Sequence, residues 1–328
     1  MIKKIYTIES GCFNPYQNMG LEEYLMYQAG EDECILYLWQ NERTVVIGRN
    51  QNAWKECRVE ELEADGGFLA RRLSGGGAVF HDMGNLNFTF LTRKNSFSVE
   101  RQTEVILRAV QAFGIHAVRT GRNDLAVDGG KFSGNAFYRT GDCCYHHGTV
   151  LIRADKHEMS KYLNVSREKL QSKGVDSVKS RVVNLAQYKP DLTVEQMRTA
   201  LLEAFAEVYE GIPVPVSPEE LPETELKEGA LWFSSWEWLY GRKIPFNFEV
   251  TRRFDWGEVL IRLEVSEGVI HNAAIWTDAL ITELPRQAER ALKGCRFRDA
   301  EIGQVFEGIG QNAWQDRMLA DIRSCLNR

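Results

Sequence analysis

Three consecutive glycines, Gly75 to Gly77, most constrain how this chain can fold, because the backbone there can turn tightly or lie against another group. Arg71 and Arg72 precede the glycines, and the apolar segment 78–80 follows them. Successive N–H groups in such a loop can form a concave site for an anion, and guanidinium groups match phosphate oxygens. A flexible turn between two strands explains the glycines alone equally well. The nearby pair His81-Asp82 and the two arginines favour the anion site.

Periodic patterns predict strands on both sides of this loop. Residues 68–72 form a candidate strand that leads into it, and 78–80 and 85–91 are candidate strands that leave it. In the last segment apolar and polar residues alternate, as they do in a sheet with one buried face. A helix is expected over 18–28, with the pair Glu22-Glu23 in its first turn, where the helix dipole favours negative charge.

Turn signals, caps and helical periodicity predict the other elements. Asp128-Gly129-Gly130 predicts a hairpin turn that places Lys131 at the start of a strand. Thr193 and Gln196 form a capping-box pattern at the start of a helix. A linker at 241–245 precedes a region with a separate strand and helix pattern. The remaining expected elements are strands 5–8, 34–39, 44–48, 125–127, 131–133, 149–152, 259–265 and 269–276, and helices 59–64, 99–113, 194–208, 283–292 and 313–326.

Charge and composition limit the class of protein. The formal net charge of −6 over 328 residues argues against a general nucleic-acid binder, which would carry a basic surface. No apolar run approaches the roughly 20 residues that a membrane-spanning helix needs. The segment before residue 10 is too short and too polar for a signal peptide. The seven cysteines include no CxxC pair, so we expect free thiols in a reducing cytoplasm.

The glycine stretch resembles the signature of lipoate–protein ligases of the A type, which reads RRxSGGGxVFHD. Every fixed position of that signature is present between Arg71 and Asp82. Other segments resemble the family in the family's own order, from near residue 14 to near residue 240. These segments are Trp54–Cys57, Gly121–Leu125, Lys131–Ala136, His146–Thr149, Ser177–Leu185 and Ser234–Trp238.

The resemblance implies a fold and an activity. The expected fold class is α/β (α+β), with a large biotin/lipoate-ligase-like domain at 1–243 whose mixed, largely antiparallel sheet is flanked by helices. A small C-terminal α+β accessory domain is expected at 244–328. The implied reaction is ATP-dependent activation of lipoate to lipoyl-AMP, followed by transfer of the lipoyl group to a lysine of a lipoyl domain. The implied acceptors are 2-oxoacid dehydrogenase E2 subunits and the glycine-cleavage H protein.

The resemblance also implies individual site residues. Lys131 matches the family's functional lysine, whose ammonium group can lie between the acyl carboxylate and the α-phosphate and neutralise the charge that develops there. Asp124 is the expected Mg²⁺ ligand. Lys179 and Arg181 belong to a loop that is expected to cover the adenylate. The positions that match those binding ATP and lipoyl-AMP are Arg72, Gly75, Gly76, Gly77, Ala78, Val79, Phe80 and Lys131.

Two other functions fit parts of the sequence. An octanoyl- or lipoyltransferase would need no ATP, and the pair Cys143-Cys144 lies close enough to His146-His147 to supply a thiolate nucleophile and a base. A non-catalytic binding protein on the same scaffold would have no need for Lys131 or the whole glycine segment. The HHGT form and the C-terminal domain favour the ligase. The sequence leaves open the preferred acceptor, lipoate against octanoate, the oligomeric state, movement of the C-terminal domain, and the roles of Cys143, Cys144, His81 and His147.

Overall fold

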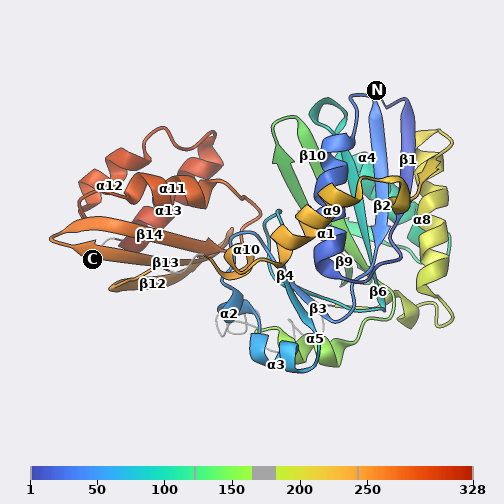
Figure 1. Ribbon diagram of the computed structural model, residues 1–328, viewed down its shortest axis with the longest axis horizontal. Helices are drawn as coiled ribbons and strands as arrows, with labels where there is room; N and C mark the ends of the chain where they lie inside the picture. The colour runs from blue at the N-terminus through green and yellow to red at the C-terminus, as the bar shows by residue number, and fades with distance from the viewer. Residues whose placement is uncertain (1, 122, 165–181, 242–243, 327–328) are drawn as a thin grey trace. The chain divides into compact units, whose positions relative to one another are not determined.

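The computed structural model describes residues 2–121, 123–164, 182–241 and 244–326. They form two compact units, whose elements are labelled in Figure 1. The first unit contains the described residues of 1–46, 57–70 and 79–235. The second contains those of 47–56, 71–78 and 236–328. Two segments from the first third of the chain therefore belong to the same compact unit as the C-terminal region.

An eight-stranded sheet forms the framework of the first unit, in the order β11-β1-β2-β6-β10-β9-β8-β7. Strand β1 pairs in parallel with β2 and β11, and the other pairings are antiparallel. The expected mixed, largely antiparallel sheet is confirmed. The strands are β1 Lys4–Glu9, β2 Glu33–Trp39, β6 Asn85–Arg93, β7 Val118–Thr120, β8 Asp124–Val127, β9 Gly130–Thr140, β10 Cys143–Leu151 and β11 Val214–Val216. A smaller sheet has the order β4-β3-β5, with β3 Thr44–Ile47, β4 Phe68–Arg71 and β5 Val79–His81.

Helices cover both faces of the large sheet. Apolar side chains of β6, such as Phe88 and Phe90, pack with Val105 of α4 (Val99–Gln111) and Phe205 of α8 (Val194–Tyr209). The alternate side chain of β6, Thr89, faces α1 (Pro15–Gln28) on the other side. The other helices of this unit are α3 Val59–Ala64, α5 Lys156–Tyr162, α9 Glu223–Ser234 and the 3₁₀ turns η1 Lys94–Ser96, η2 Leu185–Gln187 and η3 Pro218–Glu220.

Helices α1 and α9 lie side by side (Figure 1). A Cβ atom added at Gly20 would lie 2.9 Å from the backbone nitrogen of Ala230, so only glycine permits this approach. Among the described residues, no helix has both the length and the apolar composition needed to cross a membrane.

Two expectations about this unit were wrong. Helix α1 begins at Pro15, because Asn14 accepts hydrogen bonds from the N–H groups of Tyr16 and Gln17. Glu22 therefore lies in the middle of the helix, where it is buried, and not in the first turn. Strand β6 is buried on both faces, because helices cover the side on which Thr89 lies as well as the apolar side.

Hairpin and cap predictions are confirmed. Strands β8 and β9 are joined by Asp128 and Gly129, which have φ values of 50° and 78°, as the two central residues of a tight hairpin turn require. Thr193 and Gln196 form a reciprocal capping box at the start of α8.

A three-stranded sheet with its own core dominates the second unit. The order is β12-β13-β14, and the expected pair of strands corresponds to β13 and β14. Buried apolar residues such as Ile261 and Ile275 pack with Leu319 and Ile322 of α13. The sequence patterns did not predict β12 or α12. The elements are α2 Ala53–Glu56, α10 Trp236–Tyr240, β12 Phe248–Phe254, β13 Gly257–Ser266, β14 Val269–Thr277, α11 Leu284–Leu292, α12 Asp299–Phe306 and α13 Ala313–Leu326.

Candidate active site

Lys131 lies at the second position of β9, directly after the hairpin turn. The register between β8 and β9 shifts there, because Leu125 pairs with Ser133 whereas Ala126 pairs with Lys131. Phe132 is the extra residue of this β-bulge, and its side chain is fully buried in the core. Bulges redirect the side chains beside them. Here a buried aromatic residue fixes the bulge that sets the direction of the lysine.

The Lys131 ammonium group forms an ion pair with Asp124, at 2.6 Å from Oδ1. A Cβ atom at Gly134 would lie 3.0 Å from Lys131 Nζ, so the absence of a side chain at Gly134 leaves room for the lysine. The lysine side chain is 33% exposed, which leaves the ammonium group accessible to a ligand. The structure therefore brings together two of the residues predicted from the sequence, the lysine and the acidic residue.

Paired residues on neighbouring strands continue the face of the sheet on which this ion pair lies. Asn87 pairs with both Trp39 and Thr149. The Gly134 N–H donates to Thr149 Oγ1 at 3.4 Å, and Gly134 pairs with Asp124. Directly paired residues point to the same face of a sheet. We refer to this set as the sheet row, which consists of Trp39, Asn87, Thr149, Gly134 and Asp124.

A buried carboxylate lies on the same face as the sheet row. Glu22 Oε1 accepts a hydrogen bond from the Thr89 hydroxyl at 2.6 Å and lies 2.9 Å from His147 Nδ1. Trp39 Nε1 donates to Thr89 Oγ1 at 3.1 Å. Burying an ionised carboxylate is costly unless such partners replace water. This Glu22 cluster therefore holds one end of the sheet row in a fixed polar arrangement.

Two asparagines of β6 carry polar atoms that no described residue satisfies. Asn85 Nδ2 donates to Asn87 Oδ1 at 2.8 Å. The other two amide atoms, Asn85 Oδ1 and Asn87 Nδ2, are buried and have no hydrogen-bond partner within the described part of the chain. Leaving a buried polar atom unpaired costs about 1–3 kcal/mol. Both atoms belong to side chains on the same face of the sheet as Lys131, and the described residues leave them unsatisfied.

The backbone of Lys131 also contacts the segment that follows residue 181. Val182 forms a parallel bridge with Lys131, and the Val183 N–H donates to the Lys131 carbonyl at 2.8 Å. The predicted loop residues Lys179 and Arg181 lie outside the described residues. The described contacts fix the strand position from which the lysine side chain projects.

Arg72 organises the glycine loop in the second unit. Its guanidinium group donates to the carbonyl oxygens of Gly75, at 2.8 Å, and Gly77, at 2.7 Å, and to Ser74 Oγ at 3.1 Å. Gly76 has a φ of 94°, which side-chain-bearing residues rarely adopt. The buried neighbour Arg71 donates to the carbonyl oxygens of Gly48, Arg49, Gln51, Trp238 and Leu239. Arg72 therefore stabilises the conformation of the loop itself, whereas Arg71 holds the segments 48–51 and 238–239 of the same unit.

The glycine loop packs against the segment after β14. The Gly76 N–H donates to the Ala279 carbonyl at 3.0 Å. A Cβ atom at Gly75 would lie 2.5 Å from the same carbonyl oxygen and would also collide with that of Leu280. A Cβ atom at Gly77 would meet no atom within 4 Å. Close packing thus requires glycine at position 75, whereas the loop faces open space at Gly77.

The end of the signature belongs to the first unit. Phe80 is buried and its ring lies 5.7 Å from that of Tyr162, whereas Val79 is half-buried. Asp82 accepts hydrogen bonds from the N–H groups of Asp155, at 2.6 Å, and Gly84, at 2.8 Å. Burial raises the pKa of the Asp82 carboxyl group. Phe80 and Asp82 therefore stabilise the surrounding structure in this conformation.

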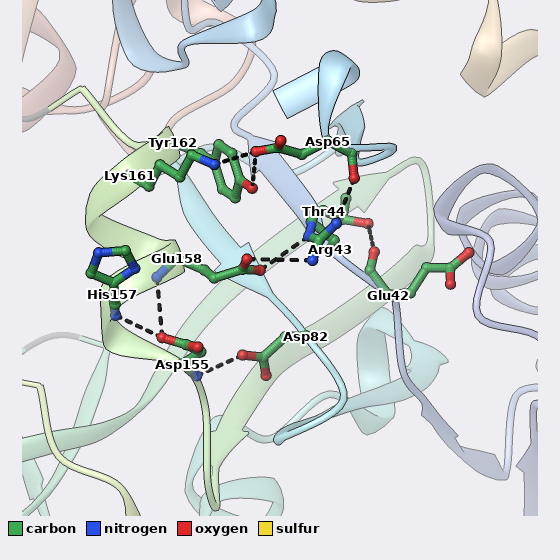
Figure 2. Close-up of polar contacts among 10 residues, drawn as sticks. All are labelled: Glu42, Arg43, Thr44, Asp65, Asp82, Asp155, His157, Glu158, Lys161 and Tyr162. Carbon is green, nitrogen blue, oxygen red and sulfur yellow. Dashed lines mark hydrogen bonds and ion pairs between the residues drawn. The ribbon is translucent and has the colours of Figure 1, made fainter. Parts of the chain in front are cut away.

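Figure 2 shows how Asp82 contributes to holding helix α5. Asp155 caps this helix by accepting from the N–H groups of His157 and Glu158. Glu158 also pairs with Arg43 at 3.1 Å, and Asp65 accepts from the Tyr162 hydroxyl at 2.7 Å. Contacts from three separate parts of the chain thus fix this short helix.

The two cysteines of the transferase alternative are both buried. Cys143 Sγ lies 2.6 Å from Arg93 Nη1, and that arginine also donates to the Ala29 carbonyl. Burial raises the pKa of the Cys144 thiol, which disfavours the thiolate that a nucleophile needs. Neither thiol is therefore exposed to an incoming acyl group.

Sequence reasoning noted His147 but missed Glu22, Thr89 and Trp39 of the Glu22 cluster, and also the two asparagines of β6. The polar positions of 85–91 are asparagine and threonine, with no charged residue among them. A solvent-exposed sheet face normally carries charged side chains. That composition was the signal for a covered polar face. The signal for Glu22 was Asn14 followed by Pro15, which is a helix start.

Comparisons with known proteins agree with this architecture. The model of the lipoyl protein ligase A/B catalytic domain matches residues 14–206, and the model of the bacterial lipoate protein ligase C-terminus matches 243–326. The chain is 38% identical over 318 residues to the lipoate-protein ligase A of Psychrobacter cryohalolentis. The aligned region covers 94% of this chain and 93% of that protein.

Solved structures resemble the chain over most of its length. P. falciparum LipL1, determined in complex with lipoate, has a TM-score of 0.84 and 29% identity, with 98% of each chain covered. A bipartite lipoate protein ligase from Thermoplasma acidophilum, studied with its E2 lipoyl domain, has a TM-score of 0.63 and 25% identity, covering 75% of this chain and 98% of that one. A lipoate-protein ligase A bound with ATP has a TM-score of 0.61 and 24% identity, covering 73% of this chain and 98% of that one, which supports the fold alone.

The catalytic-domain model matches more than half of the chain, and the curated relative aligns over nearly all of it. The predicted family resemblance and the predicted enzyme class are confirmed. The chain is a ligase and belongs to the lipoyl protein ligase A/B family.

Proposed function

We propose that this ligase uses ATP to convert lipoate to lipoyl-AMP and then transfers the lipoyl group to a lysine of a lipoyl domain. In the first step a carboxylate oxygen attacks the α-phosphorus, an oxygen–phosphorus bond forms, and pyrophosphate leaves. In the second step the lysine amine attacks the acyl carbon, an amide bond forms, and AMP leaves. The proposal is supported above all by the Lys131 ammonium group, held at one end of the sheet row.

Lys131 is the proposed catalytic residue. Its ammonium group can contact the acyl carboxylate and an α-phosphate oxygen together, and it neutralises the negative charge that increases during attack. Such fixed charges contribute most when they are already in position before the reaction. The bulge at Phe132 and the backbone bond to Val183 provide that preorganisation, because they fix the strand from which the lysine projects.

Asp124 fits the proposed Mg²⁺ site. Magnesium commonly uses one or two protein carboxylates and takes its other ligands from phosphate oxygens and water. When bound, the metal ion would offset negative charge on the phosphates. Asp124 has a further role of its own, because its carboxylate holds the Lys131 ammonium group at 2.6 Å.

The sheet row is the proposed binding site of the acyl group. It leads from the ion pair towards Trp39 and the Glu22 cluster, so an acyl chain whose carboxylate meets Lys131 can lie along it. The unpaired atoms of Asn85 and Asn87 would then hydrogen-bond polar groups of the substrate. Burial against aromatic side chains would favour the apolar part of the acyl chain.

The remaining predicted residues are proposed to bind the nucleotide. The loop conformation that Arg72 stabilises gives the backbone of Gly77 and Ala78 access to open space, where phosphate groups can approach. Val79 and Phe80 would support this segment from β5. Lys179 and Arg181 are proposed to cover the adenylate and shield it from water. The ATP and lipoyl-AMP set thus remains Arg72, Gly75, Gly76, Gly77, Ala78, Val79, Phe80 and Lys131.

The proposed acceptors are lipoyl domains of E2 subunits and the glycine-cleavage H protein. Support comes from the Thermoplasma relative, which was studied with its E2 lipoyl domain. We assign catalysis to residues 1–243 and an accessory role to 244–328. The second family model, which begins at residue 243, supports this functional division.

One assay series tests the proposal. Purified protein with lipoate, ATP and Mg²⁺ is expected to form lipoyl-AMP and pyrophosphate, and addition of a lipoyl domain is expected to convert the adenylate to AMP and lipoylated protein. Octanoyl-loaded carrier protein without ATP is the control for the transferase alternative. Lipoylation that proceeds equally without ATP, with no adenylate detected, would contradict the proposal.

A further inference from the structure

His146 lies directly behind the candidate active site, on the opposite face of the large sheet from the Glu22 cluster. Its side chain is fully buried, although its neighbour His147 belongs to that cluster. The ring packs among three aromatic side chains, with centroid distances of 4.7–5.9 Å; these are Phe88, Phe90 and Phe137. Burying a polar ring among apolar side chains costs free energy unless its nitrogens are hydrogen-bonded, so packing alone does not explain a histidine at this position.

Both ring nitrogens of His146 have partners. Nε2 lies 2.8 Å from Asn135 Oδ1, and Nδ1 lies 3.1 Å from Oε1 of Gln102 in α4. Asn135 donates from Nδ2 to the Asn123 carbonyl at 3.0 Å, so its amide oxygen must be the atom that faces the histidine. An amide oxygen only accepts, and therefore His146 Nε2 carries the proton. The neutral ring then accepts at Nδ1, so the Gln102 amide must present its NH₂ group to the ring; with the amide oxygen there, Gln102 Nε2 has no hydrogen-bond partner among the described residues. Burial lowers the pKa of His146 to about 3, which keeps the ring neutral.

Asn135 connects this histidine to the turn before β8. Two further bonds join the same residues, because the Asn135 N–H donates to the Asn123 carbonyl at 2.9 Å and Asn123 Nδ2 donates to the Asn135 carbonyl at 2.9 Å. The next residue after Asn123 is Asp124, whose carboxylate holds Lys131. The contacts thus form a continuous path from the buried ring to the ion pair.

We propose that His146 is a positioning residue for Lys131, acting through its Nε2–H bond to Asn135 and the Asn123 turn. The inference rests on the proposed adenylation chemistry at Lys131. The neutral ring donates one hydrogen bond, from Nε2 to Asn135 Oδ1. This bond keeps the Asn135 amide in the orientation in which its NH₂ group donates to the Asn123 carbonyl, so that Asn135 acts as a clamp on Asn123. The clamp then keeps the Asp124 carboxylate where it aligns the lysine ammonium group. A misplacement of about 1 Å at a reacting group can reduce the rate by about 100-fold.

The two partners of the ring provide a matched control. Gln102 contacts Nδ1 from α4, whereas Asn135 contacts Nε2 and is also hydrogen-bonded to Asn123, the residue before Asp124. A purely structural histidine would make both contacts equally important for activity. A positioning histidine makes only the Asn135 contact important for catalysis.

The test compares lipoyl-AMP formation by wild-type protein and by three variants, His146→Phe, His146→Gln and Gln102→Met. His146→Phe is expected to lower kcat at least about 10-fold while KM for lipoate and ATP stays within about 3-fold. Glutamine at 146 can still donate an amide N–H to Asn135, so its kcat is expected within about 3-fold of wild type. Gln102→Met is expected to lower thermal stability yet keep the wild-type kcat.

The outcomes separate this inference from the proposed function. If wild-type protein forms no lipoyl-AMP, the proposed function fails first. If it does, but His146→Phe keeps the wild-type kcat, or Gln102→Met lowers kcat as much as His146→Phe does, the inference is wrong. Asn135→Ser provides a second test that keeps the histidine itself, and it is expected to match the kcat loss of His146→Phe. Nitrogen NMR of wild-type His146 is expected to show the Nε2–H tautomer, and the Nδ1–H tautomer would overturn the inference without any activity measurement.

Discussion

His146 and Glu22 illustrate how individual buried groups support opposite faces of one sheet. His146 is neutral and bonded at both ring nitrogens, among aromatic side chains. Glu22 is a buried carboxyl group that accepts from Thr89 and lies beside His147. Each group is tolerated in the interior only because specific partners replace water. Their removal should therefore change stability in ways that depend on the partner left behind.

The buried histidine makes the protein sensitive to acid. The pKa of His146 falls from its ordinary 6.5 to about 3, so between these values the unfolded chain binds a proton that the folded chain does not. Stability is therefore lost as pH falls through this window, by up to about 1.4 kcal/mol per pH unit. His146→Gln removes the titrating group. Between pH 7 and pH 5 the free energy of unfolding, measured with urea, is expected to fall by about 2 kcal/mol more for the wild type than for this variant. Equal losses in the two proteins would contradict the assignment of this acid sensitivity to His146.

The buried carboxylate should matter for both stability and substrate binding. Glu22→Ala removes the carboxylate that accepts from the Thr89 hydroxyl and lies beside His147, and a loss of about 1–3 kcal/mol in unfolding free energy is expected. Calorimetry is expected to show weakened lipoate binding and unchanged ATP binding. Glu23→Ala, at the adjacent and less buried position, is the control, with a stability change within about 0.5 kcal/mol. Equal effects of the two variants would exclude the assigned role.

The sequence could identify Lys131 and Asp124 as separate residues, but not their pairing. The hairpin turn was visible in Asp128-Gly129, whereas the bulge at Phe132 depends on how that side chain fits the core. Packing of this kind is set by residues distant in the chain, such as Val105 in α4. Local patterns carry no signal for it.

Among the elements, helices α1 and α9 show how closely two segments distant in sequence can pack. The Gly20 backbone lies against that of Gly229 and Ala230, with no room for a Cβ atom. Such contact positions α1, and with it Glu22, over the sheet. The position of Glu22 in the candidate site therefore depends on the close approach of Gly20 and Gly229.

Gly20→Ala is expected to destabilise the protein by about 1–3 kcal/mol, because the new methyl group would overlap α9. Chemical denaturation measures this change. Gly11→Ala is the matched control, since a Cβ atom there would meet nothing within 4 Å, and its effect is expected within about 0.5 kcal/mol. A Gly20→Ala protein as stable as the Gly11→Ala protein would show that α9 does not pack this closely.

Elements with strong local signals were predictable, and those defined by their neighbours were not. The capping box at Thr193 and the β8–β9 turn are confirmed, because each depends on two or three adjacent residues. Helix α12 and strand β12 were missed, since many of their residues are polar and their stability comes from packing with β13 and α13. The second buried face of β6 was missed for the same reason.

At the scale of the whole molecule, each compact unit has its own main hydrophobic core among the described residues. The glycine loop belongs to the unit with β12–β14, through the bond from Gly76 to Ala279 and the close packing at Gly75. The loop's conformation should therefore depend on the stability of that unit. Units with separate cores can unfold separately.

Differential scanning calorimetry should show whether the glycine loop depends on the stability of the unit that contains it. Gly75→Ala is expected to lower the melting temperature of one transition by several degrees, because the added methyl group would collide with the Ala279 and Leu280 carbonyls. Gly20→Ala is expected to lower the other transition. If both variants shift a single transition in the same way, the two units do not unfold independently.

The proposed adenylation depends most directly on Lys131. Single-turnover formation of lipoyl-AMP should be compared between the wild type, Lys131→Ala, and the control Lys189→Ala, which removes another lysine paired with an aspartate. Lys131→Ala is expected to retain its fold and lose at least about 100-fold in adenylation rate, whereas Lys189→Ala is expected to match the wild type. A folded Lys131→Ala protein that forms lipoyl-AMP at a rate near that of the wild type would contradict the central claim.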